Sequence, residues 1–269
     1  MQGGFGVRPV GRLLSGLRWP ALLTVLAVAL SGCGSYFTSP ASVLAPAGPV
    51  AARQLSLIQI SLYIMLGIFV IVIGLWGWAI IRYRARRNDT REVSRSTGDS
   101  RLEILWTVVP LLIVIYLTVL TVQTEFYLTR EPNPATSLQV SVTGHQFFWQ
   151  FQYPGLGIST VHNLYIPVGE KVNLTLTSAD VIHSFWVPEL GGKTDAIPGY
   201  HTYMWLEASR AGSYFGECAQ FCGVGHYLMH MTVIALPPAQ FQAWVKSMQK
   251  KTSSSSAWAL EGTRLVAAR

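Results

Sequence analysis

Two cysteines, a histidine and a methionine recur at short intervals in the segment CAQFCGVGHYLM, which runs from Cys218 to Met229. Cys222, His226 and Met229 follow Cys218 at successive steps of four, four and three residues. Thiols, imidazoles and thioethers at this spacing are able to form a zinc clasp, a disulfide, a redox dithiol or a copper centre. The surrounding residues and the cellular compartment decide among these four kinds of site.

The neighbourhood of the two thiols favours a metal. A disulfide between Cys218 and Cys222 would be strained on so short a loop, and His183 in the segment DVIHSFWVP offers a second imidazole. Zinc would accept two thiolates and two imidazoles. It does not explain Met229, because a thioether is a soft, weak ligand that is typical of copper electron-transfer sites. A mononuclear blue copper site, in turn, needs one thiolate, whereas two are present here.

The positive charge of the chain indicates membrane topology and not nucleic-acid binding. The formal net charge is +7, and residues 1–122 hold eleven basic against four acidic side chains, so the whole excess lies in that part. These basic residues flank apolar segments.

The N-terminus is typical of an export signal. Three arginines precede the apolar run WPALLTVLAVAL, and small residues lead from there to Cys33. The sequence Leu-Ser-Gly-Cys, which ends at Cys33, resembles the lipobox of bacterial lipoproteins. This resemblance implies that residues 1–32 are a signal peptide of the lipoprotein type and that Cys33 carries the lipid. The alternative is an incidental Cys33 behind a plain signal or an additional anchor helix.

Two apolar segments predict a transmembrane hairpin. Residues 57–81 hold no charged side chain and residues 102–122 hold only Glu103, and both runs are long enough to cross a bilayer. The connection 82–101 carries seven arginines and is therefore assigned to the cytoplasm. With residues 33–56 as a linker, we expect a multi-pass protein of the plasma (inner) membrane whose later part lies on the periplasmic, outer side.

The remainder of the chain is rich in β-strand patterns. Short alternating stretches separated by Pro and Gly predict a sandwich or barrel of about 100 residues within residues 123–250. The segment AQFQAWVKSMQK follows a proline pair and predicts a closing helix. Residues 251–269 are Ser-rich and are assigned as a flexible tail.

The pattern C-x3-C-x3-H-x2-M with an isolated upstream histidine resembles the dinuclear copper A motif of subunit II of haem-copper cytochrome c oxidases. The resemblance covers nearly the whole chain. It includes two further motifs, Glu-x-x-Trp-Thr-x-x-Pro from Glu103 and Lys-x-Asp-x-x-Pro-Gly from Lys193. The implied fold is a membrane-anchored α + β protein in which a two-helix transmembrane hairpin precedes a cupredoxin-like β-barrel.

The resemblance also implies the metal ligands. The thiolates of Cys218 and Cys222 would bridge the two copper ions, and the imidazoles of His183 and His226 would each bind one of them. Met229 would be a weak thioether ligand, and the backbone carbonyl of Gln220 would be the remaining one. Many relatives have Glu where this chain has Gln220, and that carboxylate reaches a magnesium ion. A neutral amide is a poorer ligand for a hard cation, so we expect a weak or absent magnesium site.

Three further residues are candidates for electron or proton transfer. In most relatives a tryptophan receives the electron at the position of Phe147, and Trp149 lies two residues further along the same aromatic run. The resemblance implies cytochrome c or a similar carrier as the external donor. Because phenylalanine lacks the indole N–H, we hypothesise a donor other than a typical soluble basic cytochrome c, such as a membrane-bound cytochrome or a small copper protein. Glu103 matches a residue at the mouth of a proton-uptake channel.

The resemblance implies subunit II of a proton-pumping terminal oxidase with cytochrome-c oxidase activity. Such a chain receives single electrons from the external donor and passes them to haem in subunit I, and it performs no oxygen chemistry itself. Subunits I and III, the donor and the bilayer are the expected partners, and nucleic acid is not. Two alternatives are a quinol oxidase subunit II, which generally lacks the copper ligands, and a membrane-anchored copper- or zinc-binding lipoprotein.

Overall fold

The structure, a computed structural model, describes residues 24, 27, 28, 39–84 and 98–251 of the 269-residue chain. Cys33 and nearly all of the predicted signal peptide and tail lie outside the described residues, as does most of the predicted cytoplasmic loop.

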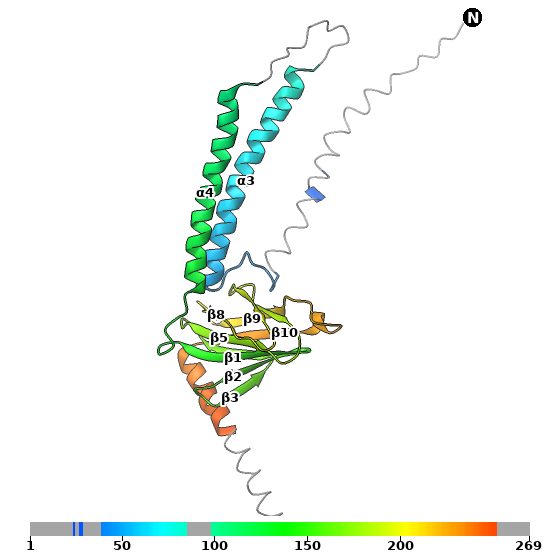
Figure 1. Cartoon of the computed structure of the whole chain (residues 1–269). Helices are drawn as coiled ribbons and strands as arrows, with labels where there is room; N and C mark the ends of the chain where they lie inside the picture. The colour runs from blue at the N-terminus through cyan, green and yellow to red at the C-terminus, as the bar shows by residue number, and fades with distance from the viewer. Residues whose placement is uncertain (1–23, 25–26, 29–38, 85–97, 252–269) are drawn as a thin grey trace, which may run out of the picture.

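Two long helices, α3 (Pro49–Arg82) and α4 (Ser100–Thr129), extend from one side of a β-domain (Figure 1). Apolar side chains remain exposed along the middle of both helices, as expected for segments that face lipid. Pro49 occupies the first turn of α3, and the carboxylate of Asp99 caps α4 by accepting a hydrogen bond from the Arg101 N–H at 2.9 Å. The predicted membrane-anchored α + β class is confirmed.

Both helices continue beyond the apolar segments that the sequence marks. The first begins eight residues before residue 57, inside the predicted linker, and the second ends seven residues after residue 122. Hydropathy locates the part of a helix that crosses lipid, whereas the helix itself ends where its backbone finds other partners. Val50 and Ala51, in the additional first turn of α3, are buried against the β-domain.

The β-domain consists of two five-stranded sheets with the orders β3-β2-β1-β5-β8 and β4-β10-β9-β6-β7. Most neighbours are antiparallel, and the parallel pairs are β1 with β5 and β4 with β10. The helix over residues 238–251 closes the domain (Figure 1). The strands are β1 Leu138–His145, β2 Phe148–Tyr153, β3 Ile158–Val161, β4 Asn163–Pro167, β5 Val172–Ser178, β6 His183–Trp186, β7 Lys193–Ala196, β8 Thr202–Leu206, β9 Gly212–Cys218 and β10 His230–Leu236.

Alternating burial along the strands builds one core between the sheets. In β5 every second residue is buried, and Val142, Phe151, Leu164 and Phe185 are fully buried. Because β1 and β5 are parallel, both strands end at the same edge, where Gly144 pairs with Ser178. The start of β6 reaches that edge as well, since the His183 ring lies against Gly144. The end of β9 lies beside it, because Phe185 pairs with Cys218.

A stack of cations and aromatic rings joins the helices to the domain. Arg53 of α3 lies 4.5 Å from the ring centre of Tyr127 in α4, and that ring meets Trp205 of β8 edge-on at 5.6 Å. The Lys171 ammonium lies over the Trp205 ring, 4.8 Å from its centre, and the indole N–H donates a hydrogen bond to the Leu128 carbonyl at 2.9 Å. Trp205 therefore links both helices to the sheet.

We predict that Trp205→Ala lowers the free energy of unfolding of the β-domain by about 3–5 kcal/mol, because it opens a cavity at this junction. Trp205→Phe is the matched control and should cost only about 1 kcal/mol, mainly through the lost hydrogen bond. Urea unfolding of the detergent-solubilised full chain, followed by near-ultraviolet circular dichroism, measures both. Equal, small effects of the two substitutions would contradict a bridging role.

Candidate metal centre

The loop between β9 and β10 carries most of the candidate ligands. Strand β9 ends at Cys218 and β10 begins at His230, and the loop between them contains the short 3-10 helix His226–Leu228. The Cys218 N–H donates a hydrogen bond to the Met229 carbonyl at 3.0 Å, which closes the base of the loop. The ends of the segment are therefore fixed by the β9–β10 pairing.

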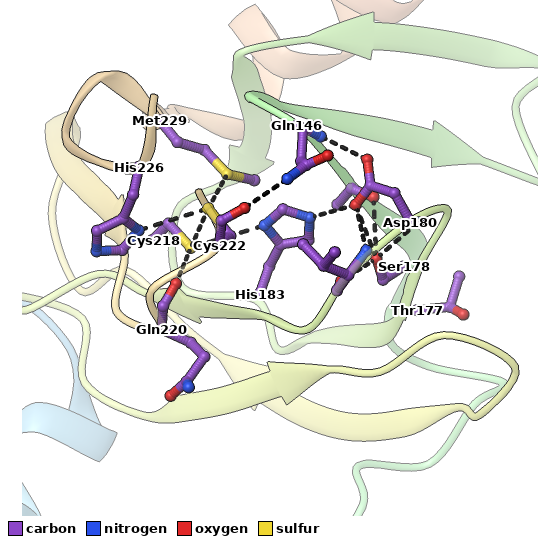
Figure 2. Close-up of polar contacts among 12 residues, drawn as sticks. Gln146, Thr177, Ser178, Asp180, His183, Cys218, Gln220, Cys222, His226 and Met229 are labelled. Carbon is purple, nitrogen blue, oxygen red and sulfur yellow. Dashed lines mark hydrogen bonds and ion pairs between the residues drawn. The ribbon is translucent and has the colours of Figure 1, made fainter. Parts of the chain in front are cut away.

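The predicted donor atoms meet inside and beside this loop (Figure 2). The sulfur atoms of Cys218 and Cys222 are 4.0 Å apart, too far for a disulfide, and both thiols are free. The Nδ1 atom of His183 lies 3.9 Å from the Cys218 sulfur, and Nδ1 of His226 lies 3.5 Å from the Cys222 sulfur. Each thiol thus has its own imidazole.

Two weaker donors complete the set. The Met229 sulfur is 3.8 Å from the Cys222 sulfur, and the Gln220 carbonyl oxygen is 3.2 Å from the Cys218 sulfur. The Gln220 side chain points away from the thiols in Figure 2 and is exposed. Thiolate, imidazole and thioether groups together suit copper, and they are more donors than one tetrahedral zinc ion requires. The residues therefore fit the copper pair that the resemblance implies.

The centre is largely closed to water. His183 and Met229 are fully buried, and Cys218 and Cys222 are each 5 % exposed. His226 is half-buried beside an open hollow that Trp186, Lys193, Glu217 and Ala219 also line. The imidazole of His226 is thus the most accessible of the ligand side chains.

The ring of His183 is held on several sides. Its Nε2 atom lies 2.7 Å from Oδ1 of Asp180, which leaves Nδ1 directed at Cys218. A side chain at Gly144 would place its Cβ 2.7 Å from the imidazole, so only glycine allows this close approach. On the other side Trp149 meets the ring edge-on at 5.8 Å. A carboxylate behind a ligating imidazole fixes its tautomer and orientation.

The turn between β1 and β2 is tied to the same centre. The Gln146 backbone N–H donates to Oδ2 of Asp180, and its side-chain amide donates to the Cys222 carbonyl, both at 2.6 Å. The Phe147 ring lies against the loop, where a Cβ on Gly225 would come within 2.5 Å of it. The loop is therefore braced from outside as well as closed at its base.

The two thiols differ in acidity. Burial raises the pKa of Cys218, but hydrogen bonds from His183 and from backbone groups outweigh it and bring the pKa to about 7. Burial and the neighbouring Cys218 raise the pKa of Cys222 to about 12. For His183, burial lowers the pKa, yet contact with Cys218 and Asp180 leaves it raised. One thiolate thus forms readily, and the second proton leaves when metal binds.

The remaining sequence candidates lie elsewhere. Glu103 is in the first turn of α4, exposed along the helix, and Cys33 lies outside the described residues. Trp149 is fully buried, so an external partner does not contact it directly, and its part in electron entry stays a prediction. Its ring lies in the core behind His183. Phe147, which is only half-buried, remains accessible at the loop.

The sequence reasoning missed the residues that support the ligands, Asp180, Gln146 and Gly144. A signal for Asp180 was present, because Asp-x-x-His places a carboxylate near an imidazole three residues later. Nothing in the local sequence links Gln146 to Cys222, since the two residues are 76 positions apart.

Comparisons with known proteins show which family the chain belongs to. The chain matches the family "Cytochrome C oxidase subunit II, periplasmic domain" over residues 157–236 and "Cytochrome C oxidase subunit II, transmembrane domain" over residues 41–124. It is 37 % identical to cytochrome c oxidase subunit 2 of Alkalihalophilus pseudofirmus, over 84 % of this chain and 67 % of the relative. It is 38 % identical to quinol oxidase subunit 2 of Bacillus spizizenii, over 89 % of this chain and 74 % of the relative.

Among solved structures, the chain is similar to the periplasmic domain of subunit II of cytochrome oxidase from Bradyrhizobium japonicum. The sequence identity is 29 % and the TM-score is 0.42, and the alignment covers 44 % of this chain and 97 % of that domain.

We predict that Asp180→Asn weakens copper binding by roughly 10- to 100-fold, because the imidazole loses the carboxylate that orients it. Competition titration of the reduced, metal-free full chain with a copper chelator measures the affinity. Asp195→Asn, on the exposed face of β7, removes the same charge nearby and should leave the affinity unchanged. Equal affinities for the native chain and the Asp180 variant would show that the contact does not support the ligand.

Proposed function

We propose that this chain, which belongs to the cytochrome c oxidase subunit II family, holds a dinuclear copper centre where electrons enter a proton-pumping terminal oxidase. The observation that carries the proposal is the convergence of two free thiols, two imidazoles and a thioether at one end of the β-domain. Family membership alone does not choose the electron donor, because relatives named quinol oxidase subunit 2 match equally well.

The complete donor set favours a protein donor over quinol. A quinol oxidase subunit II is expected to lack the copper ligands, whereas this chain has all of the candidate donors and surrounds them with Asp180, Gln146 and Phe147. A simple copper or zinc carrier would need only the ligands. Such a carrier would have no use for a hairpin that matches the oxidase transmembrane domain.

When bound, copper would supply a centre that accepts and releases one electron at a time. The residues of this chain support that chemistry by keeping the ligands stiff and dry. The loop is closed at Cys218 and Met229, and the His183 ring is held by Asp180, Gly144 and Trp149. Ligands that move little between redox states keep the barrier to electron transfer low.

The proposed setting is the plasma membrane, with the β-domain on the outer, periplasmic side. There it would take electrons from an external carrier, such as cytochrome c or a small copper protein, and deliver them to haem in subunit I. Subunit III is a further expected partner. The proton-uptake role of Glu103 and the lipid on Cys33 remain predictions from the sequence.

We predict that Cys222→Ser in the assembled oxidase lowers oxygen uptake driven by a reduced carrier protein by on the order of 100-fold or more, because a shared ligand is lost. Quinol should support no comparable turnover in the native complex. Oxygen-electrode measurements of the uptake rate with the reduced carrier protein and with quinol distinguish the two electron donors. Quinol-driven uptake that is rapid and equal in the native and Cys222→Ser complexes would favour the quinol oxidase alternative.

A second prediction concerns Gln220, whose amide replaces the carboxylate of many relatives. Metal analysis of the native complex should find no tightly held magnesium or manganese, because a neutral side chain binds hard cations poorly. Gln220→Glu should increase manganese retention after gel filtration, while the carbonyl and the copper content stay unchanged. One tightly held magnesium ion per native complex, lost in Gln220→Ala, would contradict the prediction.

A further inference from the structure

Large apolar side chains surround the metal centre and are open to solvent. Val224 is 91 % exposed and Phe221 75 % exposed, on the loop that supplies most of the ligands. Two more apolar residues lie on the loop that leads to His183. We call the following group the apolar rim: Val181, Ile182, Phe221, Val224, Tyr227 and Leu228. Single exposed apolar residues are ordinary, but a gathering of them around one site marks a contact surface.

The two loops of the apolar rim meet at the turn between β1 and β2. Val181 directly follows Asp180, whose carboxylate accepts the Gln146 N–H at 2.6 Å. Val224 lies between Gly223 and Gly225, the two glycines that contact the Phe147 ring. The half-buried Phe147 therefore lies between the two parts of the rim. The amide of Gln146 also contacts the Cys222 carbonyl, so this surface adjoins the thiol centre itself.

Free charge is scarce on this surface. The segment from Cys218 to Met229 contains no Asp, Glu, Lys or Arg. On the loop before His183 the acidic residue is Asp180, and its oxygens already accept the His183 ring nitrogen and the backbone N–H groups of Gln146 and Val181. Lys193 and Glu217 instead line the hollow beside His226.

We propose that the apolar rim is the docking face for an electron-carrier protein whose own exposed redox edge is apolar and uncharged. The inference rests on the proposed function and names the kind of donor. A lysine-ringed carrier would lose hydration of its ammonium groups against these apolar side chains, and the carboxylate on the rim's own loops, Asp180, already accepts hydrogen bonds within the protein, which disfavours such a carrier. An apolar carrier gains from burying the rim side chains. Weak redox complexes between proteins bury little surface area, so a small patch such as the apolar rim is sufficient for docking.

The test uses the assembled oxidase and a small blue copper protein whose copper edge is ringed by uncharged apolar residues. Its zinc-substituted form reports binding by biolayer interferometry, independently of electron transfer, and its reduced copper form reports the second-order rate in stopped flow. Both quantities should change less than about two-fold between 20 and 200 mM salt, because screening acts on charges. A lysine-rich cytochrome c should react more slowly.

Substitutions at Val224 separate apolar from electrostatic docking. Val224→Asp and Val224→Lys should each weaken binding at least about ten-fold, since either charge would be buried against an apolar partner. Val224→Leu should bind as the native chain does. Val161→Asp is the matched control, because Val161 is a 46 % exposed valine on β3, outside the apolar rim, and should have no effect.

Three outcomes would overturn the docking proposal. The first is unchanged binding in both charged variants, and the second is opposite effects of Asp and Lys together with steep salt dependence. The third is loss of subunit I from the Val224→Asp complex, which would make the apolar rim a subunit interface.

The copper content and visible spectrum of each preparation are measured in parallel. Absence of copper from the native complex would refute the proposed function, whereas native copper with unaffected docking in the variants would refute only the docking face.

Discussion

The proposed metal centre depends on the backbone of Cys218 being held from two sides. On one side this residue pairs with Phe185, which brings His183, the first residue of β6, next to its thiol. On the other side its N–H donates to the Met229 carbonyl and closes the loop that carries the remaining donors. A shift of either pairing by one residue would turn a donor side chain to the other face of its strand. The two registers therefore decide whether one compact donor set exists.

The support around that set converts a cluster of ligands into a rigid site. The Asp180 carboxylate contacts the His183 ring and also accepts the backbone N–H of Gln146, so it joins the start of β6 to the β1–β2 turn. The charge of this carboxylate is used within the protein. The same arrangement that braces the donor groups also fixes the loops that carry the proposed docking face.

Much of the fold and of the ligand set could be predicted from the sequence. The helices follow from apolar length, and the strands follow from alternation, because both patterns are local. The ends of α3 and α4 could not be predicted, since packing on the β-domain and contacts such as Trp205 with Leu128 extend them. The donor residues of the β9–β10 loop could be singled out because their spacing is a local motif, and His183 through the family resemblance; their roles as ligands stay predictions. The supporting residues could not be predicted, because strand pairing brings them together. The burial of Trp149 could not be predicted either, because it depends on the partner sheet.

The central claim is that these donors hold two copper ions as one electronic unit. The most direct measurement is elemental analysis together with electron paramagnetic resonance of the copper-loaded full chain in detergent. The account predicts a purple protein with two coppers per chain and one unpaired electron spread equally over both. A colourless zinc protein, or a single copper with its electron localised on one nucleus, would contradict it.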